Sequence, residues 1–186
     1  MGLLLSLSSV AQAEAIKAYL SSDSARFSYA TEAFGQQFGR LELDAGLLFT
    51  DHDDPARDGD YLAHVGIQVR GESLDFPLIV SIGGRAYYGE AGVHDVSGIG
   101  IGGDLLILPE SWGGFGIGAF LYHAPEVVSF GDSAGLTEYG LMASFQITPQ
   151  ASIVAGMQKV EVEIDSPNAP DVEIEKGGFF GVDIRF

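Results

Sequence analysis

The stretch LELDAGLLFT, residues 41–50, alternates between two kinds of side chain over ten positions. Leucine, alanine and phenylalanine occupy the odd positions, whereas Glu42, Asp44, Gly46 and Thr50 occupy even ones. A period of two over about ten residues is typical of a transmembrane β-strand. The polar phase mixes charge with glycine, which suits the crowded lumen of a narrow barrel better than a solvated surface. The stretch therefore predicts one face toward lipid and one toward a lumen.

The same alternation recurs along the chain. It is found in 61–70, 78–88, 97–107, 115–122, 137–147, 153–157 and 178–186. With 41–50 these segments make eight strands, and residues 25–31 alternate as a ninth. Because both termini of a bacterial barrel lie on the periplasmic side, the number of strands should be even. We therefore expect Ile16–Leu20 to be a short first strand followed by a turn at 21–24. Ten strands are favoured, and eight strands with an N-terminal tail are the alternative.

The connections between these segments alternate in length. Long polar connections are expected at 51–60, 89–96, 125–135 and 164–177. Short ones are expected at Gly71–Asp75, Pro109–Gly114 and Thr148–Gln150. Bacterial barrels have short periplasmic turns and long outer loops, and every short connection here falls on the periplasmic side. The predicted fold is an all-β, closed antiparallel transmembrane barrel with long acidic outer loops.

Composition excludes several other classes of protein. The 186 residues include 26 acidic and 9 basic ones, for a formal net charge of −17, which argues against nucleic-acid binding through a basic surface. No run of 18 apolar residues follows the start, so no transmembrane helix is expected. The 26 glycines disfavour a helical protein. The absence of cysteine rules out disulfides, thiolate metal sites and a cysteine nucleophile.

Residues 1–13 resemble a signal peptide. Gly2–Val10 is an apolar segment, and Ala11, Gln12 and Ala13 form a small-x-small cleavage site. No lysine or arginine precedes the apolar segment, so a buried N-terminal strand or helix is the alternative interpretation. We expect the barrel to comprise residues 14–186.

The chain ends in a strand that alternates up to a terminal phenylalanine. Phe180, Val182, Ile184 and Phe186 fall in one phase. By resemblance to this class of protein, such an ending is the signal that the barrel-assembly machinery recognises. Aromatic residues should also form two girdles at the membrane interfaces. The expected members are Phe76, Phe115, Phe145 and Phe186 on the periplasmic side and Phe49, Tyr61, Tyr88 and Phe180 on the outer side.

Two elements carry a resemblance to a known family. Residues 122–126, YHAPE, are followed after a loop by residues 138–140, EYG. This arrangement, with an acidic first long loop and a glycine-rich middle strand, resembles the YfaZ family of outer-membrane proteins. The last loop, 161–175, is more acidic than the family pattern. The resemblance implies an outer-membrane barrel and supplies no catalytic residues.

Charged residues in the inward phase are the main candidate site. They are Glu42, Asp44, His64, Arg70, Arg85, Asp104, Glu138, Asp183 and Arg185. Barrels of eight to ten strands barely hold their own side chains, so opposite charges packed there should pair. The favoured interpretation is a polar core that fills the lumen, and the alternative is a thin, charge-lined passage.

The loops contain weaker candidates. His123 with Glu126, Ser129 or Ser133 could form a hydrolytic group. The acidic loop 51–60 fails the calcium-loop pattern because Pro55 occupies the third ligand position. Residues 160–164 and 172–174 should form a projecting hairpin with a proline-rich tip at 166–170 and a bulge at 177–178. No catalytic residue, metal site or cofactor is predicted.

The sequence predicts a non-enzymatic outer-membrane barrel with a role in envelope structure or surface interaction. The alternatives are a narrow channel, a lipid-modifying hydrolase that uses His123, and a soluble periplasmic barrel that carries a lipid. The expected partners are outer-membrane lipids, lipopolysaccharide and the barrel-assembly machinery, with no nucleic acid. No motif sets an oligomeric state.

Overall fold

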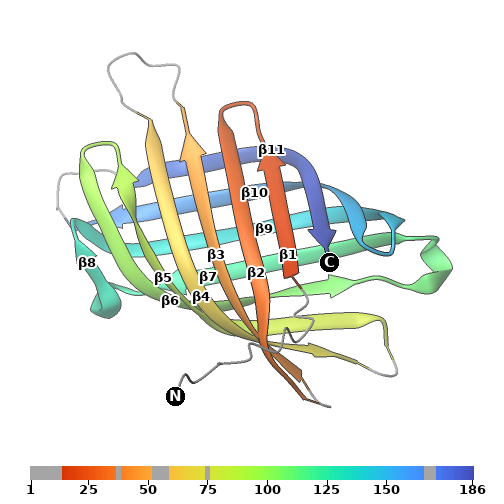
Figure 1. Ribbon diagram of the computed structural model, residues 1–186. Coiled ribbons are helices and arrows are strands. Elements are labelled where there is room, and N and C mark those ends of the chain that lie inside the picture. Colours follow the sequence, from red (N-terminus) through yellow and green to blue (C-terminus); the bar gives the residue numbers. More distant parts are fainter. Residues whose placement is uncertain (1–13, 37–38, 52–58, 74–75, 166–170) are drawn as a thin grey trace, which may run out of the picture.

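The computed structural model describes residues 14–36, 39–51, 59–73, 76–165 and 171–186, with the side chain of residue 36 excepted (Figure 1). The predicted signal peptide, the acidic segment 52–58 and the hairpin tip 166–170 lie outside the described residues. The strands are β1 Glu14–Leu20, β2 Ser24–Gln36, β3 Gly39–Thr50, β4 Asp60–Glu72, β5 Leu78–Ala91, β6 His94–Ile107, β7 Phe115–Ala124, β8 Ser129–Gly131, β9 Ser133–Thr148, β10 Ala151–Ile164 and β11 Val172–Arg185. Two single 3-10 turns, η1 Glu110–Trp112 and η2 Glu126–Val128, complete the described elements, and neither is long or apolar enough to cross a membrane.

Ten of the strands close into an antiparallel barrel, as predicted (Figure 1). Neighbouring strands pair in chain order, β1 pairs with β11, and the β5–β6 pairing completes the ring. The short first strand that distinguished ten strands from eight is β1, and its turn to β2 is closed by the N–H of Ser21, which donates to the carbonyl of Ser24 at 2.9 Å. Closure leaves the ring without free edges.

The two ends of the barrel differ in their connections. At the end that we call the terminal end, Glu14 and Arg185 lie close together, because Ala15 pairs with Arg185. The opposite end, called the distal end, carries the connections at 21–23, 51–59, 92–93, 125–132 and 165–171. The turn at 149–150 and η1 lie at the terminal end, where the short connections were expected.

The prediction of a long connection at 89–96 is wrong. β5 and β6 continue to Ala91 and His94, which pair, and only Gly92 and Val93 form the turn. Gly92 has a φ of 64°, a conformation that glycine adopts without steric cost. Its N–H donates to a carboxylate oxygen of Asp60 at 2.7 Å. The polar residues of this segment resemble a loop in the sequence, but in the structure they belong to β5 and β6 and lengthen the hairpin.

The connection at 125–135 contains structure of its own. η2 leads into β8, which pairs with the distal part of β6 through Val96, Ser97 and Gly98. β7 pairs with the remainder of β6, from Ile101 to Ile107. β6 therefore has two partners along one edge, and β8 extends that pairing where β7 has ended.

Glycine makes room for large side chains inside the barrel. A Cβ atom on Gly66 would lie 2.4 Å from a carboxylate oxygen of Asp44, and one on Gly46 would lie 2.4 Å from the ring of His64. Neither contact is possible without a shift of the neighbouring side chain. The mixture of glycine and charge in the inward phase thus reflects a lumen that is densely filled.

The distal half of the lumen is apolar, which corrects the expectation of a polar lumen throughout. Twelve buried residues form one cluster there. They are Leu48, Leu62, Tyr87, Ala91, Val96, Tyr122, Ala124, Leu136, Val160, Val162, Ile164 and Ile174. The strands here carry charge on their outer side, where Lys159, Glu161 and Glu163 alternate with the buried valines of β10. Because the outer side is charged, the apolar side chains of these strands are buried on the inner side.

The bulge in the distal hairpin lies at a different place from the one expected. Residues 177 and 178 pair regularly with Gln158 and Met157. The register shifts between Val160 and Glu161, which oppose Glu175 and Glu173, so that Ile174 is the extra residue. Both Ile174 and Glu175 are consequently buried. The shift keeps the apolar residues of both arms on the inner side.

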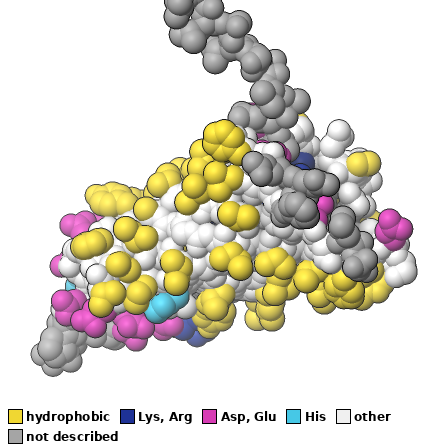
Figure 2. All heavy atoms as spheres, turned by 90° about the horizontal axis from the view of Figure 1, so that it is seen from below, with side chains coloured by type: hydrophobic (Ala, Val, Ile, Leu, Met, Phe, Trp, Pro, Cys, Tyr) yellow, Lys and Arg dark blue, Asp and Glu magenta, His cyan; other side chains and the backbone are white. Residues whose placement is uncertain are grey.

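Apolar side chains cover much of the face of the outer wall seen in Figure 2, and most of the acidic side chains in this view lie toward one end. In the register, Phe180, Leu20, Ala25, Phe49 and Tyr61 lie side by side across five strands. Three of these are members of the expected outer girdle. The rings of Phe115 and Phe145, expected in the other girdle, lie 4.6 Å apart between centroids.

Candidate functional site

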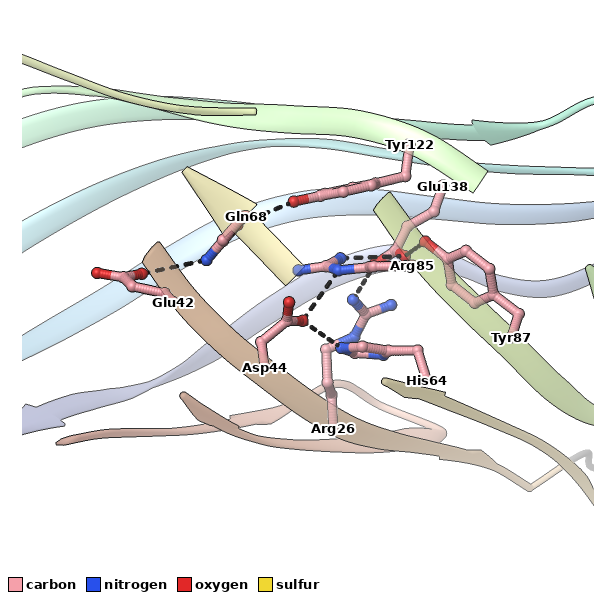
Figure 3. Close-up of polar contacts among 9 residues, drawn as sticks. All are labelled: Arg26, Glu42, Asp44, His64, Gln68, Arg85, Tyr87, Tyr122 and Glu138. Carbon is pink, nitrogen blue, oxygen red and sulfur yellow. Dashed lines mark hydrogen bonds and ion pairs between the residues drawn. The ribbon is translucent and has the colours of Figure 1, made fainter. Parts of the chain in front are cut away.

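The structure places the nine predicted lumen residues in the inward register of their strands. Asp44, His64 and Glu138 are buried, whereas Arg185 lies at the exposed mouth of the terminal end. Nine residues of the central lumen, all of them polar or charged, form one connected set (Figure 3). The sequence placed charges inside, and the structure adds which of them meet.

Glu138 of β9 is the centre of this set. Its side chain is 1% exposed and forms ion pairs with Arg26 of β2 and, at 3.6 Å, with Arg85 of β5. The hydroxyl of Tyr87 donates to the second carboxylate oxygen at 3.0 Å. Two arginines and a tyrosine hydroxyl thus converge on one carboxylate from strands on opposite sides of the barrel (Figure 3). A buried carboxylate is retained only with such partners, because an unpaired buried ion costs several kcal/mol.

Asp44 of β3 forms a second cluster next to the first. Its Oδ2 atom lies 3.0 Å from Nε of Arg85 and 3.0 Å from Nε2 of His64. The guanidinium of Arg85 also stacks on the ring of Tyr122, with 3.7 Å from its carbon to the ring centroid. Arg85 therefore links the two carboxylates and an aromatic face, which is the geometry for which a planar guanidinium is suited.

Polar contacts continue toward the terminal end. The hydroxyl of Tyr122 donates to Oε1 of Gln68 at 3.2 Å, and the amide nitrogen of Gln68 donates to Glu42 at 3.2 Å. Arg70 approaches the same carboxylate of Glu42 at 3.8 Å. This chain of contacts connects the middle of the lumen with its terminal mouth.

The remaining predicted residues lie near that mouth. The hydroxyl of Tyr19 donates to Asp183 at 2.7 Å, and the hydroxyl of Ser81 donates to Asp104 at 3.1 Å. Arg185 and Lys17 line a cavity of about 80 Å³ together with Asp104 and Asp183. A second cavity of about 50 Å³ lies among the central charged residues. Both are large enough to hold water molecules.

Sequence reasoning missed four members of the central set. Arg26 lies in the alternating segment 25–31 but was not counted with the lumen charges, although it pairs with Glu138. Tyr87, Tyr122 and Gln68 were also left out. Their position in the same phase as Arg85 and His64 was the signal that could have found them. Uncharged hydrogen-bonding residues are easily overlooked when only charges are counted.

The hydrolytic group around His123 is not brought together. His123 lies on the exposed side of β7, and its Nδ1 contacts the hydroxyl of Thr137 at 2.9 Å. Ser133 is 5% exposed and donates to the backbone carbonyls of Ser97 and Phe130. Ser129 donates to the carbonyl of Pro125. Neither serine hydroxyl contacts His123 in these bonds, so the predicted pairing of His123 with Ser129 or Ser133 is not formed.

In the part of the chain that the structure describes, no three histidine, aspartate or glutamate side chains are grouped so as to hold a metal ion. The acidic loop that raised this question lies mostly outside the described residues.

A protein-family model described as YfaZ precursor matches residues 4–186, nearly the whole chain. A search of curated proteins found no match.

Proposed function

Since this chain belongs to the YfaZ family, we propose that it is an integral barrel of the bacterial outer membrane, with a closed lumen and a role in envelope structure or surface interaction. It is proposed to act without catalysis and without transport. The family match and the closed ten-stranded barrel support the membrane location.

One observation carries the proposal, which is the inverted polarity of the barrel. Across the middle of β2 to β6, one register row on the outer wall consists of Tyr29, Ala45, Val65, Ala86 and Ile99. On the other side of the barrel, an outward row across β7, β9, β10 and β11 consists of Ile117, Ala143, Ala155 and Phe180. Soluble monomers rarely expose apolar patches larger than a few hundred Å², whereas a barrel in lipid requires such a belt.

The inner side supports a closed lumen. Charged side chains pair around Glu138 and Asp44, and the distal half is packed with apolar residues. A conducting pore would need a continuous water-filled path between its mouths. The two small cavities, of about 80 and 50 Å³, lie on the terminal side of the apolar cluster. The channel alternative is therefore less favoured than a filled barrel.

Membrane fractionation tests the location. We expect the full chain to remain in the outer-membrane fraction after carbonate extraction and to migrate differently on gels before and after heating, as stable barrels do. Release by carbonate would contradict the proposal and favour the soluble lipid carrier.

Planar-bilayer recording tests the closed lumen. The inserted protein should give no discrete conductance steps, and insertion is checked in the same sample by heat-dependent gel mobility. Steps whose ion preference changes in Arg85→Gln would overturn the closed lumen and support the channel. A phospholipid-hydrolysis assay with the wild type and His123→Ala covers the hydrolase alternative. Turnover that is lost in His123→Ala would contradict a non-enzymatic role.

A further inference from the structure

The outer wall over β7, β9, β10 and β11 contains an apolar groove. One part, of about 730 Å³, is lined by residues that include Leu121, Tyr139, Leu141 and Met157. A second part, of about 500 Å³, continues over Ile117 and Ala143 and shares Ala119, Leu141 and Met157 with the first. Small residues such as Ala119 form its floor, whereas Leu141 and Met157 are 69% and 70% exposed. A groove of this shape accepts extended acyl chains.

Polarity changes row by row along this groove toward the distal end. The row of Ala119, Leu141, Met157 and Gly178 has no polar side chain. The next row is Leu121, Tyr139, Lys159 and Lys176, and the row after it is His123, Thr137, Glu161 and Glu173. A tyrosine and two lysines thus stand where the apolar wall ends, which is the position that such residues take at a membrane interface.

The two lysines are exceptional for this protein. Of the three lysines in the chain, Lys159 and Lys176 face each other in the register of β10 and β11. Among the described strands, they are the cationic side chains that fall in the outward register, since the arginines and Lys17 fall in the inward one. Lys176 is 65% exposed. A chain with a net charge of −17 has therefore placed two cations side by side at the head of an apolar groove.

The lysines are held by carboxylates that a ligand can displace. Nζ of Lys159 lies 2.9 Å from Glu161 and 3.4 Å from Glu173, and Nζ of Lys176 lies 3.1 Å from Glu173. The Lys176–Glu173 pair is exposed, and such pairs contribute little to stability, whereas the side chain of Lys159 is 19% exposed. A phosphate group takes the place of the carboxylates without burying an unpaired charge, because the glutamates can turn toward water.

We infer that this groove binds lipid A, the phosphorylated and multiply acylated glycolipid of lipopolysaccharide, with its acyl chains in the groove and a phosphate against Lys159 and Lys176. The choice of lipid rests on the proposed function, because an outer-membrane orientation with both termini in the periplasm puts the distal end in the outer leaflet. The breadth of the groove, which runs from β6 across β7, β9 and β10 to β11, fits a lipid with several chains.

The test uses the full-length protein in nanodiscs that contain lipid A, phosphatidylglycerol or phosphatidylethanolamine, with the retained lipid measured by native mass spectrometry. Insertion is measured separately by heat-dependent gel mobility. A chain that fails to insert would contradict the proposed function itself. An inserted chain that retains phosphatidylglycerol as well as lipid A would overturn the inference alone.

Variants locate the binding site. Lys159→Gln with Lys176→Gln should lower the retained lipid A about tenfold, since each lysine near an anionic headgroup contributes appreciably to binding. Ala119→Leu should also lower retention, because it fills the floor of the groove and leaves both lysines in place. Glu161→Gln with Glu173→Gln should raise it by removing the competing carboxylates.

Glu163→Gln is the control, because it changes the net charge from the outward side of the same strand but lies beyond the row of the two lysines and the row of Glu161 and Glu173. It should leave retention unchanged. Unaltered retention in the double lysine variant, or an equal rise with Glu163→Gln, would overturn the assignment of the phosphate to Lys159 and Lys176.

Discussion

The distal half of the lumen is closed by twelve packed apolar residues, whereas the central and terminal part is filled by ion pairs around Glu138 and Asp44. Tyr87 and Tyr122 stand at the boundary, since their rings belong to the apolar cluster and their hydroxyls to the polar contacts. On β10 the outer side changes along the strand from Ala155 and Met157 to Lys159 and Glu161, and the inner side changes from Gln158 to Val160 and Val162.

This inversion follows from the medium outside each half. A strand surrounded by lipid gains nothing by hiding apolar side chains inside, so its interior can be polar if every charge is paired. A strand that projects into water must bury its apolar face inward, as a soluble protein does. The level at which the two patterns exchange marks where the proposed membrane ends.

The largest expected effect is on the polar half. Glu138→Ala leaves Arg26 and Arg85 without their shared carboxylate, so the free energy of unfolding should fall by about 3–5 kcal/mol. Denaturant unfolding of the folded barrel, followed by fluorescence, measures this change. Glu42→Ala is the matched control, because its carboxylate is nearer to solvent and 3.8 Å from Arg70, and it should cost much less. Equal losses of unfolding free energy in the two variants would show that the ion pairs at the centre of the lumen stabilise the barrel no more than the contact near its mouth.

The apolar half should respond to a cavity instead of a charge. Leu62 is 3% exposed in the distal cluster, and Leu62→Ala should cost about 3 kcal/mol in the same unfolding experiment. Leu47 on the outer wall is 43% exposed, and Leu47→Ala should cost less because lipid fills the space that the shorter side chain leaves. A larger loss for Leu47→Ala than for Leu62→Ala would contradict the tighter packing of the inside of the barrel relative to its outer wall.

Tight packing against the charges gives a third test. Gly66→Ala brings a methyl group to within 2.4 Å of the Asp44 carboxylate, so the carboxylate must shift away from Arg85. We expect a loss of about 2 kcal/mol. Gly71→Ala, in the same strand, places its methyl group in open space and should be nearly neutral. Equal free energies of unfolding for the two variants would contradict the conclusion that glycines of the inward phase provide space for the large side chains of the lumen.

The smallest effect should be a gain in stability. Glu175 is 2% exposed in the distal half, and neither of its carboxylate oxygens has a hydrogen-bond partner. Glu175→Leu should therefore raise the free energy of unfolding by about 1 kcal/mol, because the cost of a buried unsatisfied carboxylate is removed. Glu175→Gln separates charge from shape and should give a smaller gain. A loss of stability in both variants would mean that this carboxylate has a partner in the folded barrel.

The sequence predicted the half with the apolar outer wall well and the distal half poorly. Period-two alternation and the requirement for an even strand number were enough for ten strands, because both follow from short-range rules. Val160 and Val162 lie in the inward phase of β10, but counting outward apolar residues did not reveal that the pattern reverses there. The register shift at Glu161 and the two-residue turn at Gly92 depend on pairing between strands, which one strand alone does not specify.

Partners within the lumen were the other gap. The inward phase of Arg26 and Glu138 can be read from the sequence, but their contact depends on barrel diameter and strand stagger, which bring β2 and β9 to face each other. The hydrogen bond between Tyr19 and Asp183 was beyond reach for the same reason.

That hydrogen bond lies along the pairing of β1 with β11, and its two residues stand 164 positions apart in the chain. Each other neighbouring pair of the barrel joins segments that are close in sequence, so the β1–β11 contact has by far the highest loop-closure entropy. The hairpins between consecutive strands should therefore form first, and the β1–β11 pairing should form last. Until β11 pairs with β1, the molecule is an open sheet with two edge strands whose backbone N–H and C=O groups are unpaired. A chain shortened by a few C-terminal residues should therefore be prone to aggregate before the barrel closes.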